Sequence, residues 1–143
     1  MSRDASITLA WADDDYVFRL AWGELVKLQE ATGFGPPFIL DRMEGRVPND
    51  SWHMEDVSHI IRLGLIGGGL EPAKALKLTR QYVESRPPME NVKYAHAILM
   101  AGLFGAPDED ALKKNFAAET ANELTASLTE NSASDTSTAP PPP

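Results

Sequence analysis

Apolar and polar residues alternate along the first part of the chain, with an acidic break in the middle. A period of two is typical of a β-strand with one buried face. The break at residues 12–15, Ala-Asp-Asp-Asp, is typical of a turn because Asp side chains bond to nearby backbone N–H groups. The pattern predicts a β-hairpin at residues 6–20 whose apolar side packs against helices. The residues expected on that side are Ile7, Leu9, Trp11, Tyr16, Phe18 and Leu20.

After residue 21 the apolar residues are spaced three and four apart, as in amphipathic helices. Glycines and prolines divide this part of the chain into segments. We therefore expect a mainly α fold, a small domain of five or six helices preceded by the hairpin. The predicted helices cover residues 22–32, 38–44, 54–66, 72–84, 89–103 and 108–116. In the first of these, the spacing of Trp22, Leu25 and Leu28 favours a core position for Trp22, and contact with a partner is the alternative.

The composition changes near residue 117. Ala, Thr, Ser, Asn and Glu then dominate, and the chain ends in four prolines. Such a segment buries too little apolar surface to offset the entropy lost on ordering. The sequence therefore predicts a hairpin and helical domain at residues 1–116 and a low-complexity, largely disordered tail at residues 117–143. Two roles for the tail stay open, a solubilising end and a partner-binding segment.

Charge and composition narrow the function. The chain has 143 residues and a formal net charge of -8, from 13 basic and 21 acidic residues. This negative charge disfavours nonspecific binding to nucleic acid. There is no cysteine, which excludes disulfides and thiol nucleophiles. Because no apolar run has the length of a signal peptide or a membrane span, we expect a soluble, cytoplasmic protein without a membrane partner.

The residue types that catalyse reactions do not form a recognisable motif. His53, His59 and His96 lack the spacing of metal ligands, so no metal site is expected. The glycines at residues 67–69 follow a predicted helix, whereas a phosphate-binding loop follows a strand, and Glu71 would repel an anion. Close backbone packing explains these glycines better. We therefore expect neither a cofactor nor enzymatic activity.

A basic cluster is the main candidate for binding a partner. Lys74, Lys77 and Arg80 are spaced three apart on one predicted helix, with Arg62 possible as a neighbour across the glycine turn. The cluster is either a solvated face or a docking surface for an acidic helix or for nucleic acid, and the net charge favours the acidic helix. Trp52 lies in a polar loop and is the candidate for an exposed aromatic anchor. The apolar side of the same helix is expected to contain Leu76, Thr79, Tyr82 and Val83.

The order of several motifs resembles the small tail-assembly protein family of gene transfer agents and related long-tailed phages. The resemblance covers roughly residues 6–106 and omits the tail. The motifs are the hairpin, Trp-Gly-Glu-Leu at residues 22–25, Gly-Pro-Pro at 35–37, the run from Ile60 to Gly69 with its continuation at 71–78, and Arg-Pro-Pro-Met-Glu-Asn at 86–91. The resemblance transfers no catalytic residue.

The resemblance implies a tail assembly chaperone. Such a protein coats the tape-measure protein, helps the tail-tube protein to polymerise around it, and is then displaced. The partner-binding residues would be Arg62, Lys74, Lys77, Arg80 and Trp52, and self-association stays open. Two alternatives remain: a structural tail component retained in the particle, and an acidic adaptor or regulator that binds protein or DNA. Against a tube subunit, only one short hairpin is predicted, whereas a tube ring normally needs a larger sheet.

Overall fold

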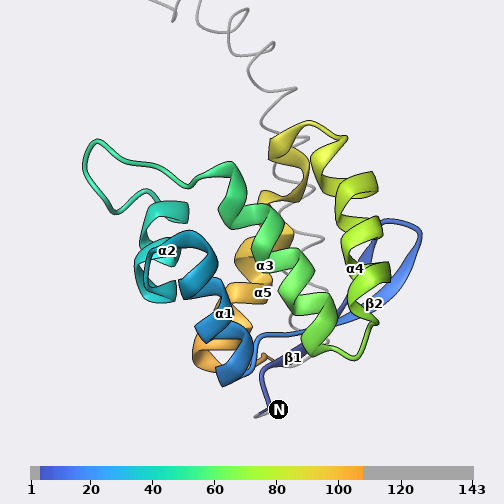
Figure 1. The fold of residues 1–143 in the computed structure, drawn as a ribbon. Coiled ribbons are helices and arrows are strands. Elements are labelled where there is room, and N and C mark those ends of the chain that lie inside the picture. The colour runs from blue at the N-terminus through green and yellow to red at the C-terminus, as the bar shows by residue number, and fades with distance from the viewer. Residues whose placement is uncertain (1–3, 108–143) are drawn as a thin grey trace, which may run out of the picture. The chain divides into compact units, whose positions relative to one another are not determined.

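The computed structural model describes residues 4–107, and these fold into a β-hairpin followed by helices (Figure 1). The hairpin and the mainly α class predicted from the sequence are confirmed. The predicted sixth helix and the boundary near residue 117 lie outside the described residues. The elements are β1 (Ser6–Trp11), β2 (Asp14–Arg19), α1 (Trp22–Thr32), α2 (Pro36–Met43), α3 (Met54–Gly67), α4 (Pro72–Thr79), the π-helical turn η1 (Arg80–Glu84), the 3₁₀ turn η2 (Pro88–Asn91) and α5 (Val92–Phe104).

The hairpin contributes one apolar face to the core. β1 and β2 pair antiparallel, with Ile7 opposite Phe18 and Leu9 opposite Tyr16. Ile7, Leu9 and Phe18 are buried, whereas the alternate residues of β1 face solvent, as the period of two predicted. The buried Trp11 ties this face to η2, 80 residues further along the chain, because its Nε1 donates a hydrogen bond to Asn91 Oδ1 at 2.7 Å.

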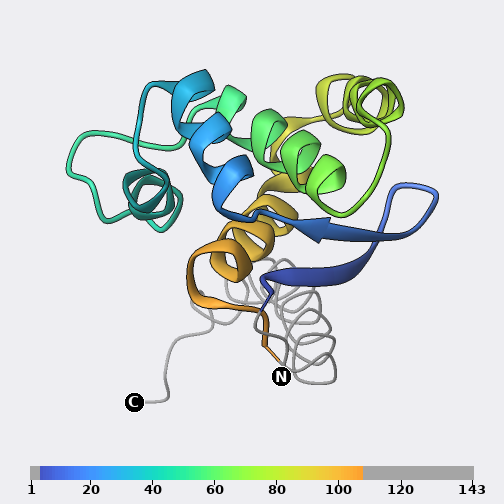
Figure 2. The ribbon, with the colours of Figure 1, turned by 60° about the horizontal axis from the view of Figure 1, so that its bottom comes forward.

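Helix α3 is the centre of the fold. It packs against β2, α1, α4 and α5, and α2 lies on the opposite side of it from α4 (Figures 1 and 2). Its inward side includes Ile60, Ile61 and Leu65, each with no exposed surface. Ile98 and Leu99 of α5 complete the interior. The apolar residues of the hairpin and those of the helices therefore pack into one core.

The end of α3 requires glycine because it lies against the backbone of β2. A Cβ at Gly67 would lie 1.9 Å from the carbonyl oxygen of Arg19, and one at Gly68 would lie 2.0 Å from that of Val17. Gly69 then adopts a φ of 109°, which L side chains rarely adopt. These residues allow the close backbone packing that the sequence predicted, although the neighbour is a strand rather than another helix.

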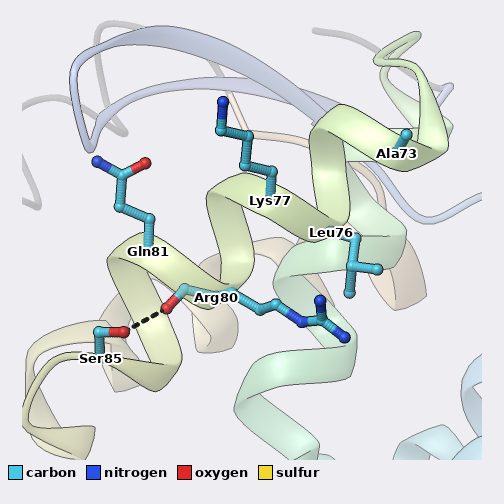
Figure 3. A pocket seen from close by; sticks show the side chains of 6 residues that line it. All are labelled: Ala73, Leu76, Lys77, Arg80, Gln81 and Ser85. Atoms are coloured by element: carbon cyan, nitrogen blue, oxygen red, sulfur yellow. Dashed lines mark hydrogen bonds between the residues drawn. The ribbon is translucent and has the colours of Figure 1, made fainter.

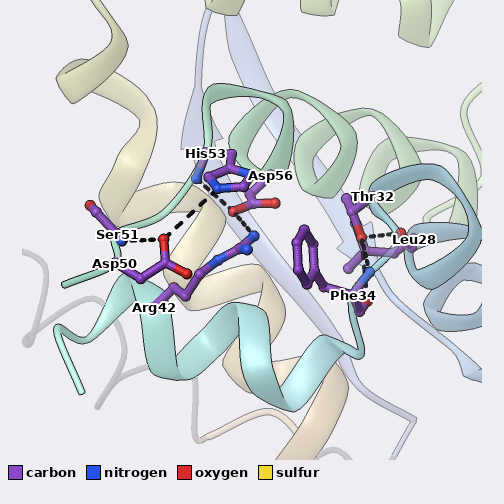
Figure 4. A network of polar contacts seen from close by, with 8 residues as sticks. All are labelled: Leu28, Thr32, Phe34, Arg42, Asp50, Ser51, His53 and Asp56. Carbon is purple, nitrogen blue, oxygen red and sulfur yellow. Dashed lines mark hydrogen bonds and ion pairs between the residues drawn. The ribbon is translucent and has the colours of Figure 1, made fainter. Parts of the chain in front are cut away.

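A buried ion pair joins α2 to the start of α3 (Figure 4). Arg42 Nη2 donates to Asp56 Oδ2 at 2.7 Å, and both side chains are at most 1% exposed. Asp56 Oδ2 also accepts the backbone N–H of His53 and so caps α3. The Arg42 guanidinium lies 4.2 Å from the centre of the Phe34 ring. Together these contacts hold both ends of the connection between α2 and α3.

Trp22 corrects one expectation from the sequence. It is 84% exposed and does not lie in the core, whereas Leu28 of the same helix is fully buried. The reason is geometric: six residues are about 1.7 helical turns, so Trp22 and Leu28 point about 120° apart. A spacing of three followed by three does not keep to one face.

Candidate functional site

The predicted basic cluster lies mainly on the outer side of α4. Lys74, Lys77 and Arg80 are all exposed, and among residues 4–107 none of the three forms an ion pair. The opposite side of the helix is buried through Ala75, Leu78 and Thr79. Three cations therefore face solvent on a protein whose overall charge is -8.

A shallow hollow lies within this basic surface (Figure 3). Its volume is about 440 Å³, and its lining is Ala73, Leu76, Lys77, Arg80, Gln81 and Ser85. Leu76 is 37% exposed, so the expectation that it points into the core is wrong. It lies one turn before Arg80 and on the same side in Figure 3, with Lys77 pointing away from both. The arrangement offers an apolar contact beside the Arg80 guanidinium, with Lys77 on the other side of the lining, which suits an amphipathic segment that carries carboxylates.

The backbone beneath the hollow changes from α-helix to π-helix at Arg80. Ser85 Oγ donates to the carbonyl oxygen of Arg80 at 2.8 Å and so bonds a carbonyl group in this turn (Figure 3). Short π segments in helices occur frequently at functional sites. Here the segment sets the direction of the last part of the basic surface, from Arg80 to Ser85.

Arg62 is separate from the hollow. It is half-buried on α3, where its Nη2 lies 3.2 Å from His59 Nδ1, and it does not line the hollow on α4. Burial, and then the neighbouring Arg62 charge, lower the pKa of His59. The structure thus brings Lys77 and Arg80 together at one site and places Arg62 in a contact with His59.

The tryptophans differ from expectation in their exposure. Trp52, the predicted exposed anchor, is only partly exposed in the connection between α2 and α3. Trp22 has the larger exposed surface and was missed because its helical spacing was interpreted as a core pattern. Exposure of this extent for a tryptophan marks Trp22 as a candidate contact residue.

The glycine turn has no free donors for an anion. The N–H groups of Gly68, Gly69 and Leu70 all bond back to carbonyl oxygens in the last turns of α3. Within residues 4–107, no three His, Asp or Glu side chains gather in a way that could hold a metal ion.

Residues 4–105 match the family described as "Phage tail tube protein, GTA-gp10". The chain belongs to this family. Comparisons with curated proteins and with solved structures found no match. The family match confirms the resemblance to tail proteins of phages and gene transfer agents, and it does not distinguish an assembly chaperone from a structural component.

In this tail-family protein, the matched residues contain both strands and α1 to α5, so the basic surface belongs to the family domain. Family membership implies interaction with other tail proteins during assembly of a phage-like particle. Among the described residues, none of the helices combines the length and apolar character needed to span a bilayer.

Proposed function

We propose that this protein is a tail assembly chaperone. It binds the tape-measure protein, helps to recruit the tail-tube protein, and leaves before the particle is complete. It works without catalysis or a cofactor, in the cytoplasm of the cell that produces the particle. The observation that carries the proposal is the basic surface of α4, where Lys74, Lys77 and Arg80 are exposed with no ion pair to a described residue.

The chemistry of this surface supports a helical client. Leu76 supplies an apolar contact beside Lys77 and Arg80, so the hollow suits an amphipathic helix with Asp or Glu next to its apolar side. One such shallow site binds weakly. A long client with repeated segments would bind many copies at once, and polymerising tube subunits would displace them one at a time. The net negative charge of the chain helps many copies to stay in solution together.

A structural tail component is the second candidate. The description of the matched family as a tail tube protein favours it. Against it, the described residues contain a single two-stranded sheet, whereas a tube built from sheets needs longer strands that pair between subunits. The chaperone role explains the basic surface and does not require a larger sheet.

Two samples from producing cells test the proposal. The tagged protein is isolated from cells during assembly, and mature particles are purified separately; both are analysed by mass spectrometry. We expect tape-measure and tail-tube proteins with the tagged chain, and no chain in particles. Stoichiometric amounts in particles would establish the structural component instead. Absence of tail proteins from the isolated complex, together with absence of the chain from particles, would contradict both.

A charge-reversal variant connects the function to the surface. Lys77→Glu with Arg80→Glu is expected to lower recovery of the tape-measure protein about tenfold, because two attractive charges become repulsive. Lys27→Glu with Arg86→Glu is the matched control, since it changes the net charge equally at exposed positions that do not line the hollow. Equal loss in both variants would assign the effect to total charge. DNA binding that is sensitive to salt and lost only in the first variant would support the adaptor.

A further inference from the structure

A second hollow lies between α2 and the end of α5. It is an open groove of about 420 Å³. Because α2 lies on the opposite side of α3 from α4 in both views, this groove is separate from the basic surface (Figures 1 and 2). The residues that matter for its chemistry are Leu40, Asp41, Glu44, Met100, Leu103 and Phe104.

The floor of the groove is apolar. Leu40 is 6% exposed, and Met100 and Leu103 are half-buried. Phe104 ends α5 at the edge of the groove and is 70% exposed. Aromatic side chains gain most from burial among common residues, so a ligand that covers Phe104 acquires a large apolar contact.

The rim of the groove has two carboxylates, Asp41 and Glu44, and one cation, Arg46. Asp41 forms no ion pair with a described residue, and its side chain is half-buried beside the apolar floor. Glu44 already contacts Arg46 at 3.2 Å and His96 at 2.8 Å. The remaining unpaired charge at the rim is therefore the Asp41 carboxylate. A cation from a partner would pair with it, and the net charge of -8 attracts such a partner over a longer range.

We propose that the groove between α2 and α5 binds a cationic amphipathic helix of a partner protein. Apolar side chains one turn apart would contact Met100, Leu103 and Phe104, and a Lys or Arg beside them would pair with Asp41. The protein then has two docking surfaces of opposite charge preference, an acidic segment on α4 and a basic segment in the groove. This inference goes beyond the proposed function because it concerns a different surface and does not depend on the client of α4.

Two labelled peptides test the proposal directly with the full chain. Both are amphipathic helices of about 14 residues with leucines at three- and four-residue spacing, long enough to span about four turns. One carries lysines beside the leucines and the other carries glutamates at the same positions. Both peptides are measured against the Lys77→Glu, Arg80→Glu variant, because the basic surface of α4 is itself proposed to bind an acidic helix. Fluorescence anisotropy is expected to show binding of the lysine peptide at least about tenfold tighter than that of the glutamate peptide. Equal affinity would overturn the charge assignment.

Substitutions locate the binding site. Phe104→Ser is expected to weaken the lysine peptide about fivefold or more, because an exposed anchor is removed. Met89→Ser is the matched control, since Met89 is 71% exposed and lies in η2, outside the groove. Asp41→Lys is expected to reverse the preference between the two peptides, whereas Glu71→Lys keeps it. Unchanged affinity in Phe104→Ser would overturn the proposal, because the peptide would then bind elsewhere.

Other occupants give different results. If a second copy fills the groove, sedimentation will show a dimer that Phe104→Ser converts to a monomer. If residues 108–143 of the same chain fill it, the lysine peptide will bind only after truncation at Pro107. Either result overturns the partner helix. Lys77→Glu with Arg80→Glu is expected to leave binding of the lysine peptide unchanged, so failure of this inference is distinguishable from failure of the proposed function.

Discussion

Where α3 meets the hairpin, the fold depends on the absence of a Cβ atom at two positions. Gly67 and Gly68 bring the end of the helix against the carbonyl oxygens of Arg19 and Val17. Gly23 is under no such restriction, because a Cβ there would meet nothing within 4 Å. Glycines at different positions therefore differ greatly in their importance for the fold, because the neighbouring backbone is close to some of them and not to others.

Gly68→Ala is expected to destabilise the protein by about 2–4 kcal/mol, because the added methyl group forces the helix away from the strand. Gly23→Ala is the control. It lies in an exposed helical position and is expected to be neutral or stabilising by about 0.5 kcal/mol. Urea unfolding followed by circular dichroism measures both. Similar stability of the two variants would show that the contact with β2 is not as close as described.

His59 gives the protein a dependence on pH. Its pKa in the folded state is lowered, first by burial and second by Arg62, so the unfolded state takes up the proton more readily. Stability contributed by the neutral ring is therefore present above the ordinary pKa of about 6.5 and is lost as the pH falls below it. The melting temperature is expected to fall between about pH 7.5 and about pH 5.5. His59→Gln should reduce this fall, and an identical fall in that variant would contradict the assignment.

At the level of elements, periodicity predicted where strands and helices form. The prediction of the hairpin was correct because Ile7, Leu9 and Phe18 alternate with polar residues. The predicted bounds of α1 were also correct, and its C-terminal end was recognisable because Gly33, with a φ of 80°, stops the helix. Faces were harder to predict. Residues spaced three apart rotate gradually around the helix axis. Trp22 and Leu76 were therefore predicted to face the core, and both are exposed.

The candidate site was predicted in part for the same reason. Lys77 and Arg80 come from one helix, so their spacing was sufficient to group them. The position of Arg62 and the groove between α2 and α5 depend on how separate helices pack, which local spacing does not contain. The pair of Arg42 and Asp56 was also missed. Its only local signal is Asp56 three residues after His53, at the position where a carboxylate caps a helix.

Removing one partner of the buried pair tests how α2 is held to α3. Asp56→Ala leaves the Arg42 charge buried without its carboxylate and is expected to cost about 3–5 kcal/mol. Asp50→Ala removes exposed contacts, with His53 at 3.9 Å and with the Ser51 N–H at 2.7 Å, and its cost is expected to stay below about 1 kcal/mol. The double variant Arg42→Met with Asp56→Ala should be more stable than Asp56→Ala alone, as measured by urea unfolding. A less stable double variant would contradict this account.

At the scale of the whole molecule, the described residues close a core of their own. Within residues 4–107, the interior is formed by the hairpin, by α3 and α5 at the centre, and by buried side chains of α1, α2 and α4. The chain is a tail-family protein over nearly the same residues, 4–105. The family domain and the packed domain therefore coincide.

Deletion of residues 117–143 is expected to leave the melting temperature within about 2 °C of the full chain, because the core residues are unaffected. Thermal unfolding by circular dichroism measures it. A cooperative loss of helix on deletion would show that the domain extends further than predicted. Deletion should also leave the affinity of the α4 surface for its client unchanged, since its lining ends at Ser85.

The hydrogen bond from Trp11 to Asn91 has a consequence for synthesis on the ribosome. The two residues are 80 positions apart, and the α5 face that covers the hairpin is translated later still. At about 5–20 residues per second, the nascent hairpin waits on the order of ten seconds before α5 can cover it. During that interval Ile7, Leu9 and Phe18 have no native partners on α5. The protein that is proposed to shield a client during assembly thus itself has an apolar hairpin that needs shielding while the chain is being synthesised.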